Sequence, residues 1–343
     1  MHIKVIKAYK KFECIASGCG DSCCDGWRID IDENSAYLYK KHTGELKEMI
    51  EQNLLKDEKG YHFRLKDGHC PFLNKEKLCD IYRCMGKDAL SQVCTSFPRK
   101  MNIYGNSMDV FLNMSCPRAA ELMLSGDGLE IEEYEDDITN TDAGNEEKTV
   151  GQIKELFMNI AKATNLSTKR KLIIMLYIAD TIKREKKDAP DIIETYLREG
   201  FAELDNSLPP DEHIKNERIR NDVIMELTEM YAYICEKRQY KSIHEKTDNK
   251  NISEEEVYER YFVYYILRHM CHEDYDTIYE KTVMLCVSYM MIKKLTETNN
   301  DIVRCIQHYC KIFEHSKKDN GLLKNTIYEN GFDRFEIIIV SLQ

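Results

Sequence analysis

The chain has 343 residues, of which 43% are hydrophobic, and it carries a formal net charge of −11. This length predicts one large domain or two ordinary ones, and the hydrophobic content argues against wholesale disorder. No apolar run approaches the roughly 18 residues that a membrane-spanning helix needs, so we expect no membrane span. The first residues lack the apolar stretch of a secretory signal, which predicts a cytoplasmic protein.

The negative charge is concentrated in one segment. Residues 127–147 contain ten Asp or Glu and no Lys or Arg, so the rest of the chain is nearly neutral. The sequence shows no basic stripe, and we expect no nucleic acid as a partner. These features divide the chain into a cysteine-rich module (1–126), an acidic linker or loop (127–148) and a helical domain (149–343).

The cysteine-rich module combines short helices with a hairpin. Apolar spacing predicts helices at about 34–41 and 45–54. Polar and apolar residues alternate over 100–112 around Gly105-Asn106, which is a turn signal and predicts a β-hairpin.

The last part of the chain has helical periodicity. Ser167 is a candidate N-cap, and Ser253 with Glu256 forms a candidate capping box. The predicted helices cover about 168–184, 211–238, 254–270, 275–296 and 300–315. We therefore expect a mainly α fold, in which the cysteine-rich module packs on an all-α domain of antiparallel helices.

Nine of the 14 cysteines fall in the first 116 residues. Without a secretory signal, clustered thiols are typical of metal binding rather than of disulfides. Four thiolates suit one [4Fe–4S] cluster or tetrahedral zinc, and a thiolate-only, histidine-poor ligand set without CxxC pairs favours the [4Fe–4S] cluster over zinc. The predicted metal ligands are Cys14, Cys19, Cys23, Cys24, Cys70, Cys79, Cys94 and Cys116.

The other cysteines are interpreted differently. Cys84 is the candidate non-ligand of the cysteine-rich module. His269, Cys271 and His272 have a metal-like composition, but we interpret them as a polar helix end. A buried core position is predicted for Cys235, Cys271, Cys286, Cys305 and Cys310, which lie in apolar helical runs.

Several segments resemble the flagellin lysine-N-methylase family, which carries a zinc- or iron-chelating cysteine module. The likeness begins with Cys14-Ile-Ala-Ser-Gly-Cys19-Gly-Asp-Ser-Cys23-Cys24-Asp-Gly-Trp27. It continues through Cys70-Pro-Phe-Leu, Leu90-Ser-Gln-Val-Cys94-Thr-Ser-Phe-Pro98-Arg99 and Ser115-Cys116-Pro117. It returns at Glu314-His315-Ser316, after departures at Cys310 and Phe313.

The resemblance implies a protein-lysine N-methyltransferase that acts on flagellin with S-adenosylmethionine. It makes Glu314 and His315 the candidate catalytic residues, as acid or base. The candidate cofactor contacts are Asp25, Trp27, Asp30 and Arg99. Because these residues come from both ends of the chain, we expect the ends to form one site with the acidic segment outside.

Two observations leave other interpretations open. The sequence lacks the Gly-rich turn of a Rossmann-type cofactor site, so S-adenosylmethionine would need a different scaffold. The catalytic candidates also fit a polar helix end, and Trp27 fits an aromatic packed on the cysteine loop. The alternative function is a non-enzymatic metal-binding or redox module whose helical domain recognises a partner.

Overall fold

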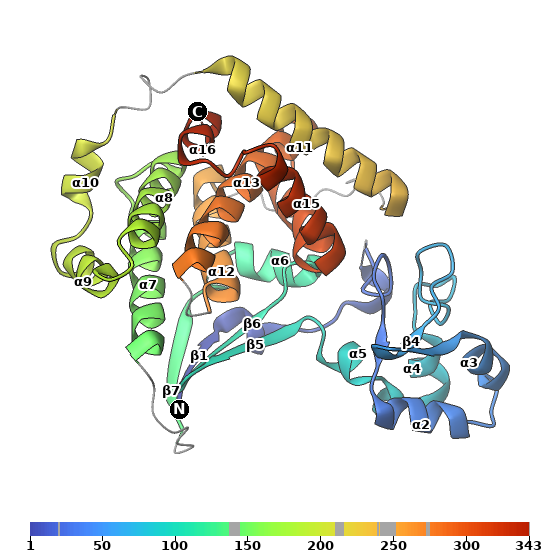
Figure 1. Ribbon diagram of the computed structural model, residues 1–343. Helices are drawn as coiled ribbons and strands as arrows, with labels where there is room; N and C mark the ends of the chain where they lie inside the picture. Colours follow the sequence, from blue (N-terminus) through green and yellow to red (C-terminus); the bar gives the residue numbers. More distant parts are fainter. Residues whose placement is uncertain are drawn as a thin grey trace.

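The computed structural model describes residues 1–19, 21–136, 145–209, 216–238, 240, 252–271 and 275–342. The chain forms a small lobe around α2 to α5 and a large lobe in which helices lie over a sheet (Figure 1). The prediction of a mainly α fold is confirmed. Each lobe has its own hydrophobic core.

A four-stranded sheet with the order β5-β6-β1-β7 underlies the large lobe. Its strands are β1 (His2–Ile6), β5 (Arg99–Tyr104), β6 (Ser107–Leu112) and β7 (Ile131–Glu135). The predicted hairpin is β5 and β6, joined through Gly105, whose φ of 51° lies in the left-handed region that glycine adopts without strain. Strand β1 pairs parallel with β6, so the hairpin is joined to the start of the chain.

The acidic segment differs from the predicted linker. Residues 131–135 form the edge strand β7, which pairs antiparallel with β1. Lysines of the short helix α1 (Lys7–Lys11) pair with this segment, with Lys7 Nζ 2.5 Å from a Glu130 carboxylate oxygen and Lys10 Nζ 2.5 Å from one of Glu132. Residues 137–144 lie outside the described part. The strand forms because alternate residues are paired with β1 and the charges face lysines or solvent.

The small lobe is built on a three-stranded sheet with the order β2-β4-β3. Its strands are β2 (Asp30–Ile31), β3 (Leu54–Asp57) and β4 (Gly60–Phe63). Its helices are α2 (Glu33–Lys41), α3 (Lys47–Asn53), α4 (Asp80–Met85) and α5 (Gln92–Ser96). The rings of Tyr39, Phe63 and Phe72 pack together in the core of this lobe.

The large lobe holds the remaining helices. They are α6 (Pro117–Leu124), α7 (Asn145–Ala161), α8 (Thr168–Arg184), α9 (Ala189–Glu199), α10 (Ala202–Ser207), α11 (Glu217–Arg238), α12 (Glu254–His269), α13 (Tyr275–Asn299), α14 (Ile302–Tyr309), α15 (Lys317–Glu329) and α16 (Phe335–Leu342). Both predicted caps are present, because Ser167 accepts from Arg170 N and Ser253 accepts from Glu256 N. None of the helices in the described ranges is long and apolar enough to cross a membrane.

The boundaries between the two hydrophobic cores differ from the boundaries of the predicted segments. The small core takes its buried residues from 29–89. Strand β1, the 99–112 hairpin and α6 contribute instead to the large core, where Phe111 and Leu112 are almost fully buried. The sheet therefore brings the end of the cysteine-rich segment under the C-terminal helices.

Candidate functional site

Both predicted catalytic residues lie at the end of α14. This helix continues into a π-helical turn over Cys310–Glu314, in which His315 N donates to the Cys310 carbonyl at 3.0 Å. A π turn inserts one extra residue into a helix and occurs frequently at functional sites. The π turn ends at Glu314, which contacts α12, and the next residue, His315, contacts Trp27 near the start of the chain.

The Glu314 carboxylate is buried against α12, with 3% of its side chain exposed. The Tyr264 hydroxyl donates to Oε2 at 2.8 Å, and Arg268 Nε lies 3.1 Å from the same oxygen. The Tyr261 hydroxyl lies 3.4 Å from Oε1, and Arg268 also donates to the Glu314 main-chain carbonyl at 2.7 Å. One helix therefore supplies a complete set of partners for this carboxylate.

Glu314 is held as an anion. Burial works to raise its pKa, but His269, Arg268 and Tyr264 outweigh burial and lower the pKa to about 2. Burial and the Glu314 charge raise the pKa of Tyr261, so this phenol stays protonated as a donor. A carboxylate with so low a pKa is a weak base, and its chemical contribution is a fixed negative charge beside Arg268.

His315 faces the cysteine-rich part of the chain. Its ring centroid lies 3.7 Å from that of Trp27 and 5.7 Å from that of Phe97. The Asn113 amide donates to Nδ1 at 3.3 Å, which places the imidazole hydrogen on Nε2. Burial, together with the charges of Arg268, Lys100 and Lys311, lowers the pKa of His315 to about 3. The ring is therefore neutral at physiological pH.

Two further contacts tie α14 to the first cysteine loop. Lys311, with 4% of its side chain exposed, forms an ion pair with Asp21, and Gln307 Nε2 donates to Asp21 Oδ2 at 3.0 Å. The same Gln307 nitrogen donates to the Ser115 carbonyl at 3.0 Å. Residues near 21–27, 113–115 and 307–315 therefore meet in one place.

Several of the eight predicted ligand cysteines lie close enough for their thiols to influence one another, and one of them, Cys94, lies in α5. Hydrogen bonding to Cys24 and burial raise the pKa of Cys23. Burial, with added repulsion from Cys23, raises the pKa of Cys94 to about 11 and that of Cys116 to about 12. Even so, within the described ranges no three His, Cys, Asp or Glu side chains converge closely enough to hold a metal ion.

The remaining cysteines follow their sequence environment. Cys84 lies apart from the others, with its sulfur 3.8 Å from a Glu45 carboxylate oxygen. Cys286, Cys305 and Cys310 are completely buried in the large core, as predicted. Cys235 and Cys271 are only partly buried, and His272 lies outside the described residues.

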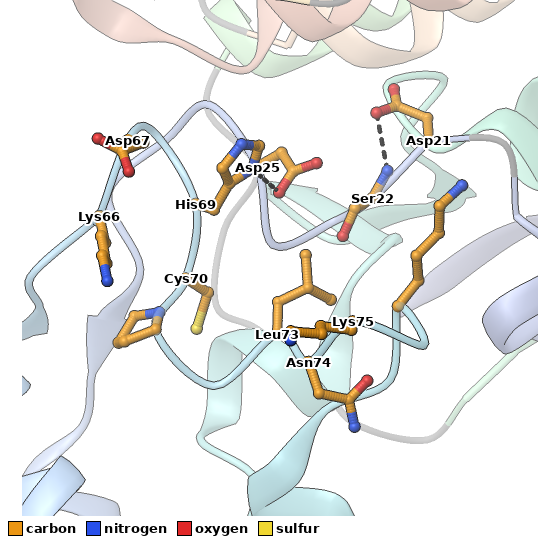
Figure 2. A pocket seen from close by; sticks show the side chains of 12 residues that line it. Asp21, Ser22, Asp25, Lys66, Asp67, His69, Cys70, Leu73, Asn74 and Lys75 are labelled. Carbon is orange, nitrogen blue, oxygen red and sulfur yellow. Dashed lines mark hydrogen bonds and ion pairs between the residues drawn. The ribbon is translucent and has the colours of Figure 1, made fainter.

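The four predicted cofactor contacts are not gathered in one place. Trp27 packs against His315 with the two rings tilted by 54°, whereas Asp25 lines a pocket and accepts from His69 Nδ1 at 2.6 Å (Figure 2). Asp30 is exposed on β2 and pairs with Arg28 at 2.5 Å. Arg99 donates to the Phe12 carbonyl at 3.2 Å and lies over the Phe12 ring.

Sequence reasoning missed several partners of the catalytic candidates. Asn113 is fully buried just after the hairpin, and its side chain accepts from Ser115 N at 3.0 Å while it donates to His315. Tyr264 and Arg268 stand four residues apart on one face of α12. An arginine directly after the apolar run 261–267 was a signal for a buried anion, because such a charge needs a counter-charge.

The sequence profile of the FliB lysine N-methylase C-terminal domain matches residues 154–340, which include α12 and the π turn. The flagellar biosynthetic protein FliU of Salmonella muenchen is 32% identical over 121 residues, or 33% of this chain and 72% of FliU. No solved structure matches significantly.

Two curated lysine-N-methylases are also similar. That of Salmonella typhimurium is 32% identical over 122 residues, covering 34% of this chain and 30% of that protein. That of Salmonella choleraesuis is 33% identical over 122 residues, covering 33% and 30%. The chain thus aligns with less than a third of the length of either enzyme.

Proposed function

The chain belongs to the FliB lysine N-methylase C-terminal domain family, and from this membership we propose that it is a protein-lysine N-methyltransferase acting on flagellin. The observation that carries the proposal is that the matched region contains the π turn, where the neutral His315 meets Trp27. The flagellar name of FliU and the lysine-N-methylase names of the other relatives support flagellin as the substrate.

The proposed methyl donor is S-adenosylmethionine. In the reaction, a neutral lysine amine attacks the sulfonium methyl, the carbon–sulfur bond breaks, and a thioether leaves with the bonding electrons. The product is a methylated ammonium, so the substrate ammonium must first lose a proton to the solvent or to a base. Only the sulfonium is cationic when the neutral amine attacks, so the site has to attract one positive charge.

The cations Arg268, Lys100 and Lys311 lie near His315, so attraction of a sulfonium at this place has to come from the aromatic rings. A neutral imidazole beside Trp27 offers π faces to a cation, which attract it by about 1 kcal/mol or more when it is desolvated. We propose His315 as the catalytic residue that contacts the reacting groups. Glu314 is then a positioning residue, because its carboxylate is fully engaged by α12 and fixes the π turn.

The test of this proposal is methyl transfer by the purified full chain. We expect methylated lysines, detected by mass spectrometry, in flagellin incubated with the chain and S-adenosylmethionine. Heat-denatured chain serves as the control. Binding of S-adenosylmethionine, measured by calorimetry, is a separate readout: no binding and no methylation would favour a non-enzymatic module instead.

A metal centre is a separate part of the proposal. We propose that the eight cysteines hold a metal, a [4Fe–4S] cluster before zinc, because thiols of this set influence one another's pKa. Binding would require the loops to close from the arrangement described here. Its test is given in the Discussion.

A further inference from the structure

A pocket of about 430 Å³ opens in the cysteine-rich part of the chain, and one of its lining residues is Asp21, which Gln307 of α14 contacts. Its walls come from residues 21–25, 66–71 and 73–77 (Figure 2). Asp67 and Gly68 form the tight turn of one wall, both with positive φ, and His69 N donates back to the Lys66 carbonyl at 2.9 Å. A second wall is fixed where Cys70 N donates to the Cys24 carbonyl at 2.8 Å. The pocket is therefore formed before any ligand arrives.

The charged side chains that line the pocket are buried to different degrees. Asp25 is 8% exposed, and Figure 2 shows one of its carboxylate oxygens bonded to His69 and the other directed away from that ring. Asp21 is already neutralised by Lys311. The lysines of the pocket, which are Lys66, Lys75 and Lys77, are all exposed at its rim. Asp25 thus lies inside, and the exposed rim is net positive because its three lysines outnumber the one exposed carboxylate, Asp67.

Between these charges the wall is apolar. Leu73 and Pro71 line the pocket beside Asp25. A ligand that fits this order has a cationic head, an apolar stem and negative charge near its outer end. A lysine side chain flanked by acidic residues has this chemistry, since its four-carbon stem can lie on apolar surface while its ammonium meets a carboxylate.

We propose that this pocket binds the lysine side chain of a protein substrate, with the ammonium at Asp25 and acidic neighbours of that lysine at Lys66, Lys75 and Lys77. His69 orients the Asp25 carboxylate. The inference rests on the proposed function, because it takes protein lysine as the substrate. It adds a selectivity: lysines in acidic sequence surroundings bind in preference to lysines in basic ones.

The test is fluorescence anisotropy of the full chain with labelled peptides, without S-adenosylmethionine. One peptide has a central lysine between acidic residues, a second has basic flanks, and a third replaces the central lysine by norleucine. We expect only the first to bind well. Asp25→Asn should weaken its binding by tenfold or more, and the combined Lys66→Ala, Lys75→Ala, Lys77→Ala variant by about tenfold, with loss of the flank preference.

Lys47→Ala is the matched control, because Lys47 is an exposed lysine of the same lobe in a surface pair with Glu51 and lies outside the pocket. If Asp25→Asn fails to fold, as judged by circular dichroism, the rim variant decides alone. Equal binding of all three peptides, or unchanged affinity in the variants that fold, overturns the proposal. Loss of S-adenosylmethionine binding with unchanged peptide binding in Asp25→Asn also overturns it, by making the pocket a cofactor site. Failure of wild type to methylate flagellin would reject the proposed function, while the peptide result would still decide the pocket.

Discussion

Glu314 shows how one residue can be essential without exchanging a proton. Its carboxylate lies among Tyr261, Tyr264 and Arg268, and its backbone carbonyl also accepts from Arg268. The buried charges of this group stabilise the protein only together, because removing one of them leaves another charge without compensation. The residue therefore fixes the position of its neighbour, His315.

Replacing Glu314 by Gln should destabilise the protein by about 3 kcal/mol at pH 7, because Arg268 is left buried without its counter-charge. Urea unfolding measures this, with Glu51→Gln in the exposed Lys47 pair as a control expected within about 0.5 kcal/mol of wild type. The pKa of Glu314 falls from its ordinary 4.5 to about 2 on folding, so its stabilisation is present above pH 4.5 and is lost as the pH falls toward 2. Wild type and variant should converge over that range; a constant difference would contradict the ion pair.

His315 should remain neutral far below the usual pKa of histidine. Burial and three nearby cations lower its pKa to about 3, against 6.5 in the unfolded chain. The unfolded state therefore binds a proton first, and His315 makes stability fall as the pH drops from 6.5 toward 3. We expect an NMR titration of the His315 ring to show no midpoint between pH 5 and 8. A midpoint near 6.5 would mean that the ring is exposed and not held against Trp27.

At the scale of elements, α14 and its π turn connect the helical lobe to the first cysteine loop. Asp301 caps the start of α14 by accepting from Arg304 N at 3.1 Å. Gln307 and Lys311 are four residues apart, and both reach Asp21. After the π turn begins, Glu314 contacts α12 and His315 contacts Trp27. Helix α14 and its π turn thereby connect the first cysteine loop to α12.

Lys311→Met should loosen that connection. The variant leaves Asp21 without its cation and should cost about 2 kcal/mol, since Asp21 keeps partial contact with water. We expect faster proteolytic cleavage between Cys19 and Cys24, with the helices of the large lobe unchanged by circular dichroism. Lys318→Met, at an exposed position on α15, is the control. Equal cleavage rates in the two variants would show that the loop is held by other contacts.

Elements with local signals were predictable, and those that depend on distant partners were not. The caps at Ser167 and Ser253 and the turn at Gly105 are set by neighbouring residues, and all three were predicted from sequence. Strand β7 was missed because every residue from Glu130 to Glu135 except Ile131 is polar or aromatic. These residues form a strand because they pair with β1. The parallel pairing of β1 with β6 likewise joins residues about a hundred positions apart.

For the whole molecule, the expectation that the two chain ends share a place came from the resemblance rather than from local pattern. Trp27 and His315 do meet there. The sequence could not identify Asn113 or Arg268 as their partners, because both contacts depend on how the sheet and α12 pack. The sequence also could not show that Asp25 and Trp27, two residues apart, have different surroundings. Asp25 lines the pocket, whereas Trp27 packs against His315.

The metal prediction concerns the assembly of the small lobe on the large one. We expect at least one equivalent of iron in protein purified without oxygen, with broad visible absorption, because a set of eight cysteines suits thiolate ligation. Cys23→Ser should lose metal and become sensitive to protease, since ligand binding contributes to folding. Protein with less than one equivalent of iron or zinc, and a Cys23→Ser variant that melts like wild type, would contradict a metal centre.

The most direct test of the account is lysine methylation of flagellin by wild type, His315→Gln and Lys318→Met, followed by mass spectrometry with S-adenosylmethionine as donor. The account predicts methylated lysines with wild type and with the surface control, and a loss of kcat of at least tenfold with His315→Gln while the fold is unchanged by circular dichroism. Methylation at the wild-type rate by a folded His315→Gln would remove the π turn from the reaction. No methylation by any of the three would contradict the enzyme itself.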